Sequence, residues 1–333
     1  MHPNKASGPD GFNAFFFRRV WHILWDDLTV AIQSFFASGN LLKEINHASI
    51  SLVPKVPNPS KLSDYRPISY CKMIYKCISK VIANRLKRVL PTLIDEAQSV
   101  FIQGRNISDN IFMAQELLRN YHRKDTPPRC AIKADIQRAF DTVRWEFLLD
   151  MLDILGFPPT FIRWIGACIT TPRFSINING ELADFFSSSW GLRQGDPIFP
   201  YLFVIARDAL ALILQKKISE DEAFSYHWRC EASRTTHICF ADDLILFCGG
   251  SIHAATLIKR SLDTFFLCSG MEANCSKSVV LVAGDNPHFG MELLIYLATL
   301  LAPCLSNISV FPSFLLVYPQ LTAGGSLIQY FPV

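Results

Sequence analysis

The stretch THICFADDLILFCGG, residues 236–250, places two adjacent aspartates, Asp242 and Asp243, between two short apolar runs. Both runs consist largely of strand-forming residues, and only a few residues separate them, which is typical of a β-hairpin. Two carboxylates crowded at a turn repel each other unless a cation lies between them, and a hard divalent cation with oxygen ligands meets that need. The stretch therefore predicts a hairpin whose acidic tip is a candidate metal site.

A second aspartate pair supplies the simpler interpretation. Asp26 and Asp27 lie in HILWDDLTV, where the apolar residues have helical spacing. Such a pair is typical of a solvated helix face, and residues 236–250 taken alone leave that interpretation open for Asp242 and Asp243 as well.

The composition indicates a globular chain with room for one or two domains. Half of the 333 residues are apolar and 18% are charged, so the chain can bury a core and need not be disordered. The formal net charge of +3 does not indicate a polyanionic partner. The ten cysteines include no C-x-x-C pair, which excludes a zinc ribbon, and no signal peptide is recognisable, so we expect reduced intracellular thiols.

The C-terminal segment Leu293–Val333 contains no Asp, Glu, Lys or Arg. Its longest apolar run, residues 293–302, ends before Pro303, whereas a membrane-spanning helix needs about twenty apolar residues. We therefore expect no association with a membrane.

One helical pattern carries a basic stripe. Lys72, Lys76 and Lys80 recur at four-residue steps, and residues 65–94 include seven basic residues and no acid. Two interpretations remain open: a solvated lysine face, or a surface that faces phosphates. Just before this helix, the prolines of PKVPNPSKLSDYRP, residues 54–67, exclude a regular helix.

The middle of the chain mixes strand and helix patterns. CAIKADI predicts a strand that ends near Asp135, and RWEFLLDMLDILG predicts a helix that ends at Gly156. FSINING and FFSSSW predict strands, and YLFVIARDALALILQK predicts a buried helix that begins near Asp196 or Pro197. This uneven order favours an α+β fold over a doubly wound parallel sheet.

Six motifs, taken in order, resemble those of reverse transcriptases of LINE-type (non-LTR) retrotransposons, of the kind abundant in plants. They are DYRPIS, KADIQRAFDTV, GLRQGDP, YLFV, FADDLILF and SGMEANCSKS. KASGPDGF, FFASGNLLKEINHASISLVPK and AQSVFIQGRNISDNI are similar to segments that precede the palm in this family, so the resemblance runs from about Lys5 to about Ala283.

The resemblance implies a right-hand polymerase fold in three ranges. Residues 1–125 would be fingers-like and mainly helical, with a basic nucleotide-binding loop, and residues 126–283 would form the palm with the catalytic aspartates. Residues 284–333 would be a divergent apolar tail that resembles a frameshifted or decayed reading frame, so we expect the thumb to be missing or degenerate. Because the polymerase motifs begin close to residue 1, we expect no upstream endonuclease in this sequence.

The resemblance also implies the metal site. Asp135 and Asp242 match the two principal metal ligands of the family, and Asp243 matches the third. Two Mg²⁺ ions about 3.5–4 Å apart, for which Mn²⁺ can substitute, would assist the attack of a primer 3′-OH on a nucleotide α-phosphate. Asp141 is expected to be structural.

Three residues match family positions around the incoming nucleotide. Phe140 matches the aromatic gate that clashes with a ribose 2′-OH, whereas without the neighbouring motif a core aromatic would be the favoured interpretation. Gln194 and Gly195 match the Gln-Gly turn beside the nucleotide. The family pattern G-D-P-L-S-P is here GDPIFP, so Phe199 replaces a serine and we expect this turn to be distorted.

Three basic residues match positions that contact phosphates. Lys55 and Arg66 match fingers residues that hold the triphosphate, and the fork of Arg66 suits phosphate oxygens. Lys277 matches a lysine that protonates pyrophosphate, although a plain surface lysine is the alternative.

The function that the resemblance implies is RNA-directed DNA polymerisation, with an RNA template, a DNA primer and dNTPs. One alternative is a catalytically inactive retrotransposon-derived remnant. Another is a maturase-like RNA-binding protein, which would need a basic C-terminal domain that the sequence lacks. Phe140 disfavours an RNA-templated RNA polymerase, because a bulky gate excludes ribonucleotides. The resemblance implies residence in the nucleus, although no run of five Lys or Arg marks a nuclear signal.

Overall fold

The computed structural model describes residues 2, 6–121, 123, 125–178, 180–240, 243–274, 277–284 and 308–310. The chain forms two compact units, and each combines two separate stretches of sequence. The first unit contains residues 1–93 and 140–206, and the second contains residues 94–139 and 207–333. The sequence instead predicted consecutive ranges that meet at residues 125 and 283. The assignment of residues 1–125 to the fingers and of residues 126–283 to the palm stays a prediction.

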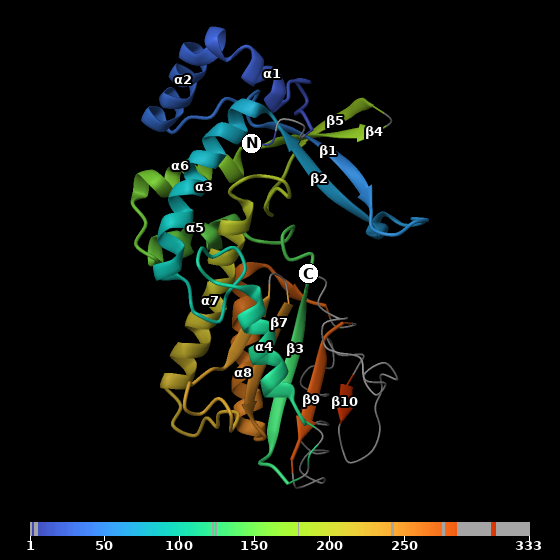
Figure 1. Cartoon of the computed structure of the whole chain (residues 1–333), viewed down its shortest axis with the longest axis vertical. Coiled ribbons are helices and arrows are strands. Elements are labelled where there is room, and N and C mark those ends of the chain that lie inside the picture. The colour runs from blue at the N-terminus through green and yellow to red at the C-terminus, as the bar shows by residue number, and fades with distance from the viewer. Residues whose placement is uncertain are drawn as a thin grey trace. The chain divides into compact units, whose positions relative to one another are not determined.

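The first unit contains a four-stranded sheet with the strand order β2-β1-β4-β5 (Figure 1). β1 pairs with β2 in antiparallel and with β4 in parallel orientation, and β4 pairs with β5 in antiparallel orientation. The strands are β1 (His47–Pro54), β2 (Tyr65–Cys71), β4 (Arg173–Ile178) and β5 (Glu181–Ser187). The helices are α1 (Ala14–Arg19), α2 (Trp21–Ser38), α3 (Met73–Leu93), α5 (Trp145–Ile154) and α6 (Pro159–Thr170).

The proline-rich segment 54–67 is the connection of a β-hairpin. β1 ends at Pro54 and β2 begins at Tyr65, with a short 3-10 helix at Leu62–Asp64 between them. The exclusion of regular α-helix is thus confirmed, and the part of residues 1–125 that the structure describes is mainly helical. The two flanking strands were not predicted, because prolines interrupt the segment between them and β1 gains its second neighbour only from the distant β4.

Helix α3 has the apolar face that its spacing predicts. Ile78 and Ile82 are buried on it, together with Leu86. Lys76 and Lys80 lie on the other side and are half-buried and exposed, respectively. The Nζ of Lys76 donates to the carbonyl of Ala6 at 3.2 Å. Both interpretations of the basic stripe stay open.

The second unit contains a larger sheet with the strand order β10-β9-β3-β7-β6. Its neighbours pair in antiparallel orientation except β9 and β10, which are parallel. The elements are α4 (Ile107–Leu118), β3 (Arg129–Gln137), β6 (His237–Phe240), β7 (Asp243–Gly249), α8 (Ile252–Ser269), β8 (Glu272–Ala273), β9 (Val279–Ala283) and β10 (Ile308–Val310).

Helices α4 and α8 cover this sheet (Figure 1). α4 contributes Ala114 and Leu117 to a buried cluster with Ala131 of β3 and Phe247 of β7. α8 contacts β7 and begins at an N-cap, Ser251, whose hydroxyl accepts the backbone N–H of Ala254. The sheet is thus packed between two helices.

Several predicted elements are confirmed. The hairpin around the aspartate pair is β6 and β7, with Phe240 opposite Asp243. The strand that ends near Asp135 is β3, and the helix after it is α5. The buried helix is α7 (Phe199–Ser219), which begins three residues after Asp196 and belongs to the first unit up to Ala206.

The apolar tail is described only at β10, which pairs with β9 and so adds a strand to the sheet. The rest of the predicted divergent tail, residues 285–307 and 311–333, lies outside the described residues. The expectation that the thumb is missing or degenerate concerns these same residues and stays a prediction. Among the helices that the structure describes, none has the length and apolarity required to cross a membrane.

Candidate active site

Asp135 and Asp243 are directly opposite each other on neighbouring strands of the second unit. They form the last pair in the antiparallel register of β3 and β7. Opposed residues of a β-ladder project to the same face, so the two carboxylates share one face of the sheet. The predicted meeting of Asp135 with Asp243 is confirmed. Asp242, the other predicted ligand, lies outside the described residues.

A lysine accompanies this carboxylate pair. The Nζ of Lys133 lies 3.3 Å from Oδ1 of Asp243, and both side chains are partly exposed. Lys133 precedes Asp135 by two residues on β3 and therefore projects to the same face. An ammonium group thus lies at the place where two carboxylates need a positive charge.

The backbone of Asp135 is fixed from the side opposite β7. Its N–H donates to the hydroxyl of Ser278 at 3.2 Å, and its carbonyl accepts the N–H of Asn274 at 2.7 Å. Ser278 also donates to the carbonyl of Asn274 at 2.8 Å. Lys277 is exposed and adjacent to Ser278, so the structure brings the segment that carries Lys277 to the strand of Asp135. Its predicted role with pyrophosphate stays a prediction.

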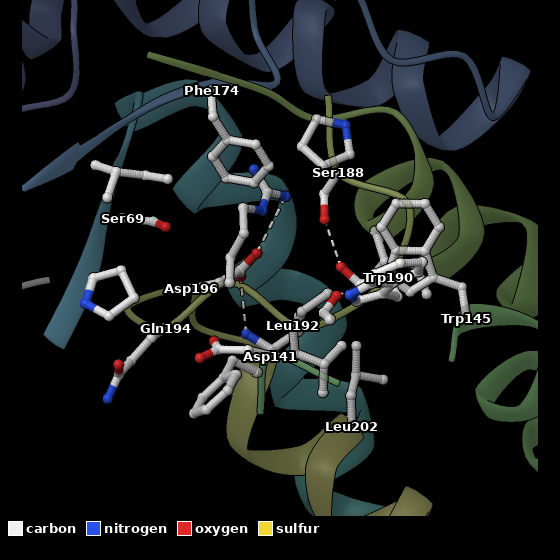
Figure 2. Close-up of a pocket in the computed structure, with 18 of the residues that line it drawn as sticks. Ser69, Asp141, Trp145, Phe174, Ser188, Trp190, Leu192, Gln194, Asp196 and Leu202 are labelled. Atoms are coloured by element: carbon white, nitrogen blue, oxygen red, sulfur yellow. Dashed lines mark hydrogen bonds and ion pairs between the residues drawn. The ribbon is translucent and has the colours of Figure 1, made fainter. Parts of the chain in front are cut away.

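In the first unit, the GLRQGDP turn docks on strand β2. The N–H of Ser69 donates to the carbonyl of Gln194 at 2.9 Å. Gly195 has a φ of +109°, and a Cβ there would lie only 2.8 Å from the carbonyl oxygen of Ser69. Only glycine fits this conformation and this close approach. Gln194 and Ser69 both line a cavity of about 150 Å³ (Figure 2).

A buried polar network connects this turn to helix α3. The guanidinium of Arg193 lies 3.3 Å from the carboxylate of Asp196, and both side chains are about 95% buried. Arg193 also stacks over the ring of Tyr75, with 4.0 Å between the guanidinium carbon and the ring centroid. The hydroxyls of Tyr75 and Ser79, both on α3, donate to Asp196. Burial raises the pKa of Tyr75 well above its usual value, so its phenol remains a donor.

The departure at Phe199 does not abolish the turn. The Asp196 carboxylate accepts the N–H of Ile198 at 3.1 Å, and the Asp196 carbonyl accepts the N–H of Phe199 at 3.2 Å. Phe199 is buried at the first residue of α7. The turn is therefore hydrogen-bonded with phenylalanine in place of serine.

Phe140 lies in an aromatic cluster next to this turn. Its ring centroid is 4.7 Å from that of Phe199 and 4.5 Å from that of Phe203. Its carbonyl accepts the N–H of Leu192 at 2.8 Å, which ties the predicted gate to the segment that carries Gln194. Phe140 is half-buried, so it has both packing partners and a solvent-accessible edge. The adjacent Asp141 lines the cavity in Figure 2.

Lys55 and Arg66 lie at the end of the β1–β2 hairpin where the two strands are connected. Both are exposed, and the Nζ of Lys55 donates to the carbonyl of Ser63 at 2.8 Å. Arg66 pairs with Val53, whereas Pro67 and Ser69 line the cavity. Since successive strand residues alternate between faces, Arg66 projects from the face opposite Pro67. The structure therefore does not place Arg66 in the cavity of Figure 2.

Sequence reasoning missed several residues of both sites. Arg193 and Asp196 stand within the quoted turn, and their three-residue spacing between opposite charges was a usable signal. No local pattern could have revealed Tyr75 or Lys133 as partners, because those contacts depend on the folded arrangement.

The carboxylate pair suits a hard divalent cation. Carboxylate oxygens are the ligands that Mg²⁺ and Mn²⁺ prefer, and Asp135 and Asp243 present them side by side. Among the residues that the structure describes, no three His, Cys, Asp or Glu side chains gather as a metal-binding group. The predicted third ligand, Asp242, is not among those residues.

The fold is of the right-hand polymerase class. The chain belongs to the reverse transcriptase family, since the family model described as "Reverse transcriptase (RNA-dependent DNA polymerase)" matches residues 53–296. The predicted family is thereby confirmed. Members of this family typically use divalent metal ions and a nucleic-acid template.

Two of the relatives are proteins of transposable elements. The chain is 28% identical over 285 residues to the uncharacterized 149 kDa protein of transposon TX1 from Xenopus laevis. The aligned region covers 86% of this chain and 21% of that protein. It is 27% identical over 249 residues to the Pol polyprotein of the type-2 retrotransposable element R2DM from Drosophila melanogaster. That alignment covers 75% of this chain and 22% of the relative. The chain thus spans about a fifth of their length. The expected likeness to plant elements is not borne out by these two animal relatives.

Among solved structures, apo telomerase of Candida tropicalis truncated from its C-terminal domain is similar to this chain. The TM-score is 0.48 at 15% identity, over 79% of this chain and 56% of the telomerase chain.

Proposed function

We propose that this chain extends a primer 3′-OH with dNTPs on an RNA template, using two Mg²⁺ ions held by Asp135, Asp242 and Asp243. One observation carries the proposal: in a chain of the reverse transcriptase family, Asp135 lies directly opposite Asp243 on one face of the sheet. When bound, the cations lower the pKa of the primer hydroxyl and neutralise the triphosphate and the leaving pyrophosphate.

The chain's own residues bind and orient the substrates. Lys55 and Arg66 donate to triphosphate oxygens, a role supported by their exposure at one end of the hairpin. Phe140 excludes a ribose 2′-OH, supported by its half-buried ring against Phe199. Gln194 and Gly195 form the turn beside the nucleotide, and Lys277 gives a proton to pyrophosphate.

A primer-extension assay tests the proposal. The purified chain is incubated with oligo(dT) annealed to poly(rA), with dTTP, and with Mg²⁺ or Mn²⁺. We expect extension that requires the cation and is absent in Asp135→Asn. A folded wild-type chain that binds the template-primer but does not extend it would instead support a catalytically inactive remnant. Residence in the nucleus stays a prediction.

A further inference from the structure

Arg207 reaches both strands of the aspartate hairpin from helix α7. Its Nη2 donates to the backbone carbonyl of Asp243, the first residue of β7, at 2.9 Å. Its guanidinium also interacts with the thiol of Cys239 on β6. Arg207 is only 4% exposed, so these contacts are made in the interior.

The guanidinium approaches from the face of the sheet opposite the carboxylates. Cys239 is paired with Leu244, so their side chains share one face. Asp243 precedes Leu244 and projects to the other face, which it shares with Asp135. Arg207 therefore supports the hairpin from the face opposite the carboxylates.

Other contacts hold the outer edge of β6. The N–H of Cys239 donates to the carbonyl of Ala97 at 3.0 Å. The side-chain amide of Asn110 donates to the carbonyls of both Ala97 and Cys239, at 2.7 and 3.2 Å. The edge of β6 is thus fixed by Ala97, which precedes α4, and by Asn110, which lies in α4. At the start of β7, Arg207 adds a side-chain hydrogen bond to the strand pairing of Asp243.

We propose that Arg207 is a positioning residue for the metal site. By fixing the Asp243 carbonyl and Cys239 together, it holds the start of β7 so that the carboxylates of Asp135 and Asp243 are preorganised for a divalent cation. This inference rests on the proposed function, because it assigns Arg207 to the same reaction.

The positive charge of Arg207, taken alone, predicts the opposite change in cation affinity when Arg207 is replaced. A guanidinium repels a nearby divalent cation, so its removal alone would strengthen cation binding. Loss of a hydrogen bond that orients a ligand weakens binding instead, typically by about 10- to 100-fold. The direction of the change in cation affinity therefore distinguishes positioning from simple electrostatics.

The test uses the full chain with Arg207→Lys and Arg207→Met. Lysine keeps the charge but loses the planar fork, and methionine loses both. Asp208→Asn is the matched control, since Asp208 is the next residue of α7, is similarly buried, and accepts the N–H of Asp95 at 2.9 Å. Mn²⁺ binding is measured by electron paramagnetic resonance without nucleic acid, and folding is checked by circular dichroism.

We expect both Arg207 variants to bind Mn²⁺ at least about tenfold more weakly and Asp208→Asn to bind as the wild type does. In primer extension, kcat should fall by a similar factor while KM for dTTP stays within about twofold, because positioning of the ligands affects the reaction and not nucleotide docking. If Arg207→Met does not fold, Arg207→Lys decides.

Unchanged or tighter Mn²⁺ binding in a folded Arg207 variant would overturn the inference. So would an equal loss in Asp208→Asn. A wild-type chain that extends no primer but shows the expected pattern of Mn²⁺ binding would refute the proposed function and leave the positioning role intact. A wild-type chain that binds no Mn²⁺ would refute both.

Discussion

Asp135 and Asp243 form the last opposed pair of strands β3 and β7, with the Nζ of Lys133 3.3 Å from the Asp243 carboxylate. Under the proposed function the two carboxylates share the bound cations and so act as one unit. The lysine supplies a positive charge to the same face. The arrangement makes the effect of removing either acid predictable.

The first prediction concerns the two principal acids. Asp135→Asn and Asp242→Asn should each abolish extension of the primer, and the double variant should be no worse than either single one, because groups that act as a unit have non-additive effects. Extension is measured on poly(rA) with oligo(dT). Asp26→Ala, on the exposed face of α2, is the control and should leave the rate unchanged. Comparable losses at Asp26 and Asp242 would show that folding, and not chemistry, was damaged.

The second prediction concerns the choice of sugar. Phe140→Val removes the ring that would clash with a ribose 2′-OH, so incorporation of ribonucleotides relative to deoxynucleotides should rise by about tenfold or more, which corresponds to roughly 1.4 kcal/mol or more of discrimination. The ratio is measured with rUTP and dTTP in single-nucleotide extension. An unchanged ratio in a folded variant would assign Phe140 to the core alone.

The third prediction follows from the ring contact between Phe140 and Phe199. Phe199→Ser removes a contact of 4.7 Å between centroids, and aromatic pairs contribute about 0.5–1.5 kcal/mol. A less constrained Phe140 should therefore admit ribonucleotides about two- to tenfold more often, less than in Phe140→Val. Phe185→Ser is the control, because Phe185 is exposed and packs on His47 instead. A larger effect of Phe199→Ser than of Phe140→Val would contradict the assignment of the gate.

The fourth prediction concerns the support of the GLRQGDP turn. Asp196→Ala leaves the guanidinium of Arg193 buried without its carboxylate, which typically destabilises a protein by about 3–5 kcal/mol. The free energy of unfolding is measured in urea. Glu116→Ala is the comparison, since its pairs with Arg119 and Arg229 are near the surface and the loss should stay below about 1 kcal/mol. Similar losses in the two variants would contradict the importance of the buried network.

The sequence predicted elements whose signal is local. The hairpin of β6 and β7 follows from two short apolar runs around Asp242 and Asp243, and α5 follows from its leucine spacing and Gly156. Strands β1 and β2 were not predicted, because a proline-rich segment separates them and β1 is completed by the distant β4. Their stability comes from pairing and not from propensity.

The same distinction holds for the sites. The resemblance named Asp135 and Asp243, and the register then placed them opposite each other. The contacts of Arg193 with Tyr75 and of Arg207 with Asp243 were not predictable, because each joins a helix to a segment distant in sequence. Charged residues of this kind stand out only once their burial is known, since a buried charge requires partners.

The last prediction concerns stability in acid. Burial lowers the pKa of His227 to about 4, with the charges of Arg129 and Arg229 as the further causes. Burial likewise lowers the pKa of His237 to about 4. Both histidines are neutral in the folded chain and take up protons more readily when it unfolds. The free energy of unfolding should therefore fall as the pH decreases from about 6.5 towards 4.

Asp208 has the opposite effect in this range. Burial raises its pKa to about 6, so the folded chain holds that proton more tightly, and this contribution to stability grows as the pH falls from about 6 towards 4. Asp208 therefore offsets part of the stability that the two histidines lose in acid. His227→Phe keeps a ring between Tyr121 and Phe247 but has no proton to gain. In urea unfolding at pH 7.5 and pH 4.5, the variant should lose less stability on acidification than the wild type, and an equal or larger loss would show that His227 is not neutralised by burial.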